Sequence, residues 1–107
     1  ARVLDSSWPD GALALVGPEG SGKSHLARVW LATSGGPPRD LVEDADRGFD
    51  AEAMFHRLNR AARNEVRVLL TARSRPVAWP AALPDLRSRL NALPVAEIAA
   101  PDDTVLE

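Results

Sequence analysis

Residues 12–24 place an apolar run, a glycine-rich segment and the start of an amphipathic stretch in direct succession. The run ALALV at 12–16 has the length and continuous apolar character of a strand buried on both faces of a parallel sheet. The segment GPEGSGKS at 17–24 matches the pattern G-x-x-x-x-G-K-[S/T], whose glycines let the backbone turn tightly and point several N–H groups inward. A helix from Lys23 to about Thr33 would aim its positive amino end at the same point. The succession predicts a P-loop that binds polyphosphate; the alternative is a glycine-rich turn that only joins a strand to a helix.

The predicted loop and the first helical turn supply the candidate nucleotide-binding residues. Lys23 is the only lysine among 13 basic residues, and it would offer a compact positive charge to the outer phosphates. The Ser24 hydroxyl would bind Mg²⁺, and His25 would pack beside the nucleotide. We expect the phosphates of ATP or ADP to lie against Gly17, Pro18, Glu19, Gly20, Ser21, Gly22, Lys23, Ser24 and His25.

The composition argues against several other classes of protein. A chain of 107 residues with 45% apolar residues can bury one modest core. Because 13 basic residues face 15 acidic ones, no broad positive field is available for a nucleic-acid backbone, and direct DNA binding is not expected. The sequence has no cysteine, which removes disulfides and thiolate chemistry and suits a cytoplasmic location. Its apolar runs fall short of the roughly 20 residues that cross a bilayer, so no membrane partner is expected.

The remainder of the chain continues an alternation of strand and helix patterns. This order predicts an α/β fold, a P-loop NTPase core in which helices flank a parallel sheet. The predicted segments are strands at 41–44, 66–71 and 95–98, a helix at 51–63 capped by Asp50, and a short helix at 85–91. The helical residues expected to face the core are Leu26, Ala27, Trp30 and Leu31 in the first helix and Met54, Phe55, Leu58 and Ala62 in the second.

Two acidic residues end the second predicted strand. A P-loop enzyme needs carboxylates at the end of a neighbouring strand to hold Mg²⁺ and to orient the attacking water. We expect Glu43 at the metal and Asp44 at the metal and the water; the alternative is a solvated acidic turn. Only about twenty residues separate Lys23 from Asp44, an interval in which a full nucleotide-binding fold fits another strand and helix. We therefore expect that residues between Thr33 and Leu41 have been omitted, with a reduced variant of the fold as the alternative.

Two further polar residues lie where they could take part in catalysis. Thr71 ends the third predicted strand, where its hydroxyl could reach a γ-phosphate or the attacking water, or could merely terminate the strand. Arg87 and Arg89 lie on the short helix at 85–91, and an arginine held there could act as an arginine finger toward a neighbouring subunit. From its position alone, a surface ion pair is the better interpretation of Arg89.

Four segments, in their order along the chain, resemble a known family. They are GPEGSGKSHLARVW, LVEDADR, LLTARSRP, and LPDLRSRL followed by AAPDD. In these segments the chain resembles the DnaA-like branch of the AAA+ ATPases, and within it the Hda type of DnaA-related regulators. The resemblance implies that residues 20–24 hold the phosphates, that Glu43 and Asp44 are the Walker B acids, that Thr71 is the sensor 1 residue, and that Arg89 is the finger.

The resemblance also implies a function and partners. Proteins of this type act with the DNA-bound sliding clamp of DNA polymerase III and promote the hydrolysis of ATP by the initiator DnaA, which is its regulatory inactivation. The chain would then be a negative regulator of bacterial chromosomal replication initiation, with ATP or ADP and Mg²⁺ as cofactors and with Arg89 acting in trans. Its own ATP hydrolysis would be weak, because Glu43 stands where the family pattern has an aspartate.

The resemblance covers nearly the whole chain and sets the expected domain boundaries. Residues 1–100 would form the AAA+ core, and residues 101–107 would begin the connection to a lid domain that we expect to be absent from this chain, as is the segment that contacts the clamp. A homodimer is left open. Two other functions stay as alternatives: a DnaA-like or helicase-loader ATPase that acts on DNA directly, and a self-contained P-loop ATPase or kinase.

Overall fold

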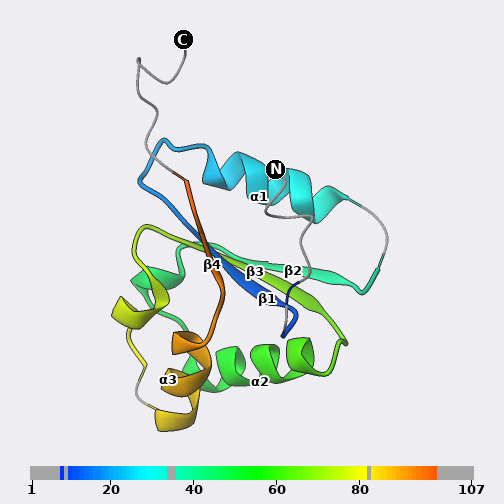
Figure 1. Ribbon diagram of the computed structural model, residues 1–107, viewed down its shortest axis with the longest axis vertical. Coiled ribbons are helices and arrows are strands. Elements are labelled where there is room, and N and C mark those ends of the chain that lie inside the picture. Colours follow the sequence, from blue (N-terminus) through cyan, green and yellow to red (C-terminus); the bar gives the residue numbers. More distant parts are fainter. Residues whose placement is uncertain (1–7, 9, 34–35, 82, 99–107) are drawn as a thin grey trace.

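Strand-forming and helix-forming segments alternate along the chain, as their apolar patterns predict (Figure 1). The computed structural model describes residue 8 and residues 10–33, 36–81 and 83–98. Asp50 caps the second helix as expected, because its side chain accepts a hydrogen bond of 3.1 Å from the Glu52 N–H. Within the described ranges the elements are β1 (Ala12–Val16), α1 (Lys23–Ala32), β2 (Arg39–Val42), the 3₁₀ helix η2 (Ala45–Arg47), α2 (Ala51–Ala62), β3 (Arg67–Ala72), the 3₁₀ helix η3 (Pro76–Ala78), α3 (Pro84–Asn91) and β4 (Val95–Glu97).

The described strands form one parallel sheet in the order β2-β3-β1-β4. β1 and β3 lie in the centre, paired from Ala12 with Val68 to Val16 with Ala72. All five residues of β1 are buried, as its continuous apolar run predicts. The expected α/β fold with a parallel sheet flanked by helices is therefore confirmed.

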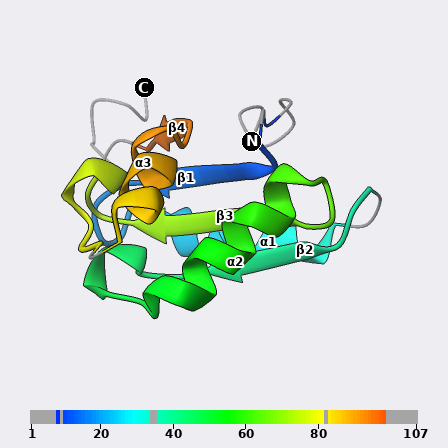
Figure 2. The ribbon, with the colours of Figure 1, turned by 90° about the horizontal axis from the view of Figure 1, so that it is seen from below.

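The helices cover opposite faces of the sheet (Figures 1 and 2). On one face, Leu13 and Leu15 of β1 pack in a cluster with Ala27 and Trp30 of α1. On the other face, Ala14 and its neighbours of the same orientation pack in a second cluster with residues of α2 and α3. Period-two alternation along a strand sends successive side chains to opposite faces. One strand thus supplies both cores.

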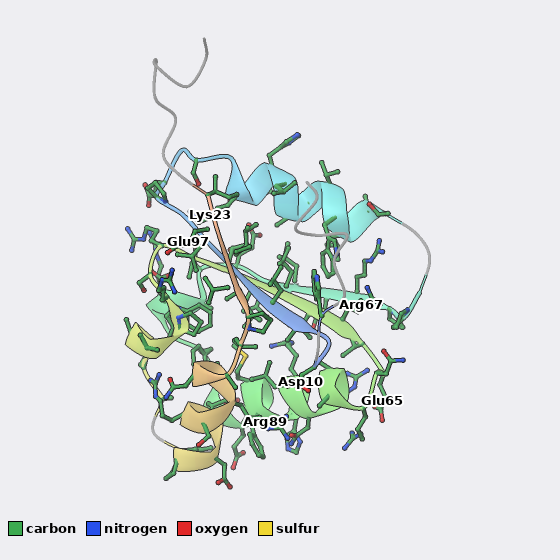
Figure 3. All side chains as sticks on the ribbon, viewed as in Figure 1. Asp10, Lys23, Glu65, Arg67, Arg89 and Glu97 are labelled. Carbon is green, nitrogen blue, oxygen red and sulfur yellow. The ribbon has the colours of Figure 1, made fainter. Side chains whose placement is uncertain are left out.

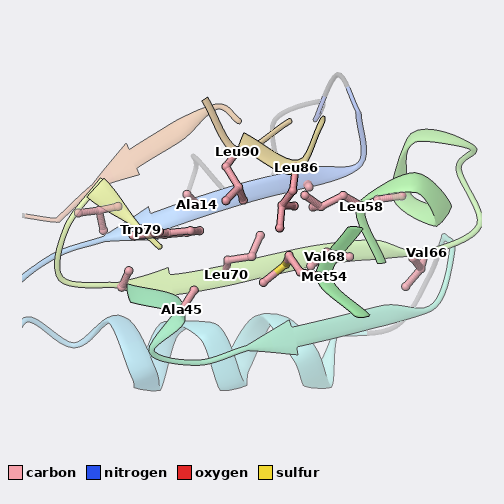
Figure 4. Close-up of a cluster of buried hydrophobic side chains, with 14 residues drawn as sticks. Ala14, Ala45, Met54, Leu58, Val66, Val68, Leu70, Trp79, Leu86 and Leu90 are labelled. Atoms are coloured by element: carbon pink, nitrogen blue, oxygen red, sulfur yellow. The ribbon is translucent and has the colours of Figure 1, made fainter. Parts of the chain in front are cut away.

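The cluster beneath α2 and α3 is the larger of the two described clusters (Figure 4). Met54 and Leu58 are one helical turn apart on α2, and Leu86 and Leu90 are one turn apart on α3. All four side chains are at most 3% exposed. Each such burial contributes roughly 1.5–3 kcal/mol relative to exposure, so this face fixes both helices on the sheet.

Three details differ from the sequence expectations. The second strand ends at Val42, before the acids, and its four residues are half-buried because an edge strand has a sheet neighbour on one side only. Leu31 is 41% exposed and Ala62 is also exposed, although both were expected to face the core. In each case the preceding residue is buried instead. The buried residues of these helices are Lys23, Ala27 and Trp30 in α1, and Met54, Leu58 and Ala61 in α2.

Some expectations fall outside the described residues. The proposed connection at 101–107 is among them, and so is part of the segment between α1 and β2, where the omission of residues stays a prediction. Across the described ranges, no helix has the length and apolar character needed to cross a membrane.

Candidate nucleotide-binding site

The carboxyl ends of the two central strands, β1 and β3, lie side by side, and the chain leaves them toward opposite faces. β1 leads into α1 on one face, whereas β3 leads through η3 into α3 on the other. In open α/β sheets, ligands bind in the crevice outside the carboxyl ends of the strands, where such connections diverge. The glycine-rich loop at 17–24 begins at this crevice.

Gly17 is fixed in the closely packed start of the loop. Its N–H donates to the Ala72 carbonyl at 3.0 Å and so extends the pairing of β1 with β3 by one residue. A Cβ atom at this position would lie 2.8 Å from the Ile98 carbonyl oxygen and 2.9 Å from Ser21 Oγ. Because real Cβ atoms almost never approach other atoms so closely, only glycine fits here.

Gly20 and Gly22 are needed for a different reason. Their φ angles are 79° and 88°, in the left-handed region that glycine enters without steric cost. A Cβ on either would meet none of the described atoms within 4 Å, so the backbone conformation alone selects glycine at these two positions. The two left-handed residues turn the chain from the end of β1 into the first turn of α1.

The amino end of α1 leaves its backbone donors available. Gly22 is the cap residue, offers no side-chain hydrogen bond, and is followed by a first turn without an acidic residue. The first four N–H groups of a helix have no acceptor within the helix, and together with the helix dipole they favour an anion. Ser24 and His25 are exposed in this turn. Phosphate oxygens are the type of acceptor that this end can take.

Lys23 is the buried cation of the site. It is the first residue of α1, its side chain is only 6% exposed, and its Nζ lies 3.3 Å from the Pro18 carbonyl oxygen. Among the described residues, no carboxylate forms an ion pair with it. A buried ammonium is costly unless an anion compensates it, and one neutral carbonyl at 3.3 Å compensates it only in part. The position of Lys23 therefore favours a bound anion next to the loop.

Asp44 and Thr71, each a candidate catalytic residue, are neighbours in the structure. The Asp44 N–H donates to Thr71 Oγ1 at 3.2 Å, which joins the ends of β2 and β3. Thr71 is 1% exposed, whereas Glu43 and Asp44 are exposed and directly follow β2. Asp44 has a φ of 56°, a left-handed conformation that aspartate tolerates better than most residues. The described ranges contain no group of three His, Cys, Asp or Glu side chains that could hold a metal ion, but Mg²⁺ at phosphates needs only one or two carboxylates.

Sequence reasoning missed a group of charges that surrounds the loop. Glu19, in the loop, lies 3.5 Å from an Arg47 nitrogen and 3.6 Å from an Arg73 nitrogen, and Arg73 Nε lies 3.5 Å from Asp46 Oδ2. These four residues come from the segments that follow β1, β2 and β3. Their position two or three residues beyond a predicted strand end was the available signal, because the ends of parallel strands meet at one edge of the sheet.

Arg87 and Arg89 are two residues apart on α3 but have different surroundings. The Arg87 guanidinium donates to the carbonyl groups of Pro76, Val77 and Trp79, so it holds η3 against α3. Arg89 points elsewhere: its guanidinium carbon lies 5.8 Å from the centroid of the Phe55 ring on α2. Arg87 is therefore a structural residue, whereas the half-buried Arg89 lies against the Phe55 ring.

The loop and Arg89 lie at opposite ends of the sheet (Figure 3). Arg89 lines a small cavity with Ala12 and Pro94, which stand at the amino ends of β1 and β4, whereas Lys23 follows the carboxyl end of β1. The clearest pKa shift also lies away from the loop, before β3: a hydrogen bond from Arg63 lowers the pKa of the exposed Glu65 carboxyl. The structure thus brings Lys23, Asp44 and Thr71 to one end and leaves Arg89 at the other.

Comparisons with known proteins do not assign a family: no protein-family model and no curated protein sequence matches the chain. The class of protein rests on the fold and the site. The fold is α/β with a parallel sheet, and the site is a strand, a glycine-rich loop and a helix that begins with a buried lysine.

Proposed function

We propose that this chain is the nucleotide-binding core of a P-loop NTPase that binds ATP or ADP together with Mg²⁺. The observation that carries the proposal is Lys23, which is buried at the first position of α1 without a carboxylate partner among the described residues. The uncapped amino end of α1 and the left-handed glycines beside it supply backbone N–H groups for the same phosphates.

The residues around the loop fit a magnesium ion on the outer phosphates. Ser24 follows Lys23 in the first helical turn, and its exposed hydroxyl would be one ligand. The exposed carboxylates of Glu43 and Asp44, at the end of the neighbouring strand β2, would hold the ion through water. Magnesium would neutralise charge that develops on the phosphates. Thr71, whose Oγ1 accepts the Asp44 N–H, would fix the position of that backbone relative to the phosphate.

The finer proposal is a regulator of the bacterial replication initiator DnaA, acting with the sliding clamp. Its support is the resemblance of the four segments and the position of Arg89. An arginine at the far end of the sheet from Lys23 cannot serve the nucleotide of its own chain, and this favours a role in trans. An arginine finger of this kind accelerates hydrolysis by roughly 10³ to 10⁵ where it operates.

Isothermal titration calorimetry on the intact chain tests nucleotide binding. We expect uptake of ADP and ATP with Mg²⁺, and loss of binding in Lys23→Ala. The matched control is Arg28→Ala, which removes an exposed cation from the same helix and should bind as the natural chain does. Absence of nucleotide uptake by the natural chain, with and without magnesium, would refute the proposal.

A hydrolysis assay with DnaA, the clamp and DNA tests the finer proposal. Arg89→Ala should abolish stimulation of DnaA while leaving the calorimetric affinity for nucleotide unchanged. Arg60→Ala, an exposed cation on α2, is the control. Stimulation that survives in Arg89→Ala excludes the finger role. Appreciable ATP turnover by the chain alone, lost in Lys23→Ala, would instead identify a self-contained ATPase.

A further inference from the structure

Arg73 joins the three segments that follow β1, β2 and β3. It begins the connection that leaves β3, two residues beyond Thr71. Its Nη1 lies 3.6 Å from Glu19 Oε1 in the glycine-rich loop, and its Nε lies 3.5 Å from Asp46 Oδ2 in η2. Through Glu19, the guanidinium therefore contacts the loop that would bind the phosphates under the proposed function.

The two carboxylates that Arg73 faces are not equivalent. The Asp46 side chain is 11% exposed, and its Oδ1 is buried without a hydrogen-bond partner among the described residues. A nearly buried carboxylate depends on a nearby cation, since its charge is otherwise uncompensated. The Glu19 side chain is 71% exposed and can return to water, so its contact with Arg73 stabilises little. Asp46 anchors Arg73, and Glu19 is the partner that can be replaced.

The open side of Arg73 faces the start of the loop. Arg73 lines a hollow of about 410 Å³ together with Gly17 and Pro18 of the loop and Glu97 and Ile98 at the end of β4. An anion that entered this hollow would therefore lie next to the guanidinium. A phosphate is a better partner for arginine than a single exposed carboxylate, because the planar fork can donate two hydrogen bonds to it.

We propose that Arg73 is a phosphate-binding residue that recognises the outermost phosphate of a nucleoside triphosphate and so distinguishes ATP from ADP. On binding, Nη1 exchanges Glu19 for a phosphate oxygen while Nε stays with Asp46. Glu19 acts as a competitor that occupies Arg73 when that phosphate is absent. Asp46 is a positioning residue. The inference rests on the proposed function, because it presumes that the loop holds the inner phosphates.

Calorimetric titration of the intact chain with Mg-ATP and with Mg-ADP tests this inference. Arg73→Ala should weaken ATP binding on the order of tenfold, the effect of losing a hydrogen bond to a charged group, and should leave ADP binding nearly unchanged. Arg28→Ala is the control, since Arg28 is an exposed cation on α1 and is not among the residues that line the hollow. It should leave the ratio of the two affinities unaltered.

Double mutants separate a role in recognition from a role in folding. Glu19→Gln should raise the affinity for ATP relative to the affinity for ADP, and Asp46→Asn should lower it. Both effects should vanish when Arg73 is already alanine, because each acts through Arg73. If Arg73→Ala weakens ATP and ADP equally, the inference is wrong while the nucleotide-binding proposal stands. If the natural chain binds neither nucleotide, both are wrong.

Discussion

Replacing Arg87 by alanine should destabilise the fold by about 2 kcal/mol. The guanidinium donates to the Pro76 carbonyl at 2.9 Å and to the Trp79 carbonyl, both in partly buried surroundings. Each such hydrogen bond contributes about 1 kcal/mol net. Two more bonds, to the Val77 carbonyl at 3.2 Å and Asn91 Oδ1 at 3.3 Å, are exposed and add little. Alanine itself is a better helix former than arginine, so the loss comes from these contacts and not from α3.

Urea unfolding followed by tryptophan fluorescence measures this loss, because Trp79 is 1% exposed at the end of η3. The matched control is Arg89→Ala on the same helix, which removes a contact with the Phe55 ring and the lining of a small cavity and should cost at most about 1 kcal/mol. Arg87→Lys should recover less than half of the loss, since an ammonium cannot reach several carbonyls as a fork does. If Arg87→Ala unfolds at the same urea concentration as Arg89→Ala, the assignment of Arg87 as the structural member of the pair is wrong.

Two further substitutions test the fold itself by the same unfolding measurement. Gly11→Ala should lower the free energy of unfolding by more than about 2 kcal/mol, because Gly11 has a φ of 72° and a Cβ there would overlap the Ala61 carbonyl. Gly36→Ala is the control. Gly36 has a φ of 75° but open space around it, so this change measures the cost of the backbone conformation alone. Equal losses of stability in Gly11→Ala and Gly36→Ala would show that the overlap with the Ala61 carbonyl does not contribute. Asp50→Ala should cost about 1 kcal/mol through loss of the cap on α2, and Asp50→Asn should retain most of it. If Asp50→Ala leaves the free energy of unfolding unchanged, the cap does not contribute to stability.

The sequence predicted most of the fold because burial and pattern agree in its central elements. The run at 12–16 became a fully buried strand with unchanged bounds, and the alternation of strands and helices gave a parallel sheet. Strand order could not be predicted, because a pattern of apolar residues does not say which strand is a neighbour. For the same reason the half-burial of β2, which follows from its place at the sheet edge, could not be predicted.

The helical stripes show the limit of pattern reading at the level of single residues. Ala61 and Ala62 are chemically identical, and only the rotation of α2 on the sheet decides that Ala61 is buried and Ala62 exposed. In the candidate site, too, some residues could be predicted from the sequence and others could not. The loop was predicted because its glycines and lysine are contiguous in sequence, whereas Arg73 meets Glu19 and Asp46 only because the sheet brings the ends of its strands together.

Under the proposed function, the burial of Lys23 also implies a conflict between stability and nucleotide binding. A methionine at this position has a similar length and no charge to desolvate, so Lys23→Met should melt at a higher temperature than the natural chain when both are free of ligand. The natural chain would regain this stability only when nucleotide is bound. Its free energy of unfolding would then rise by about 1.4 kcal/mol for each tenfold increase of free nucleotide above the dissociation constant. Its resistance to heat would therefore depend on how much nucleotide surrounds it.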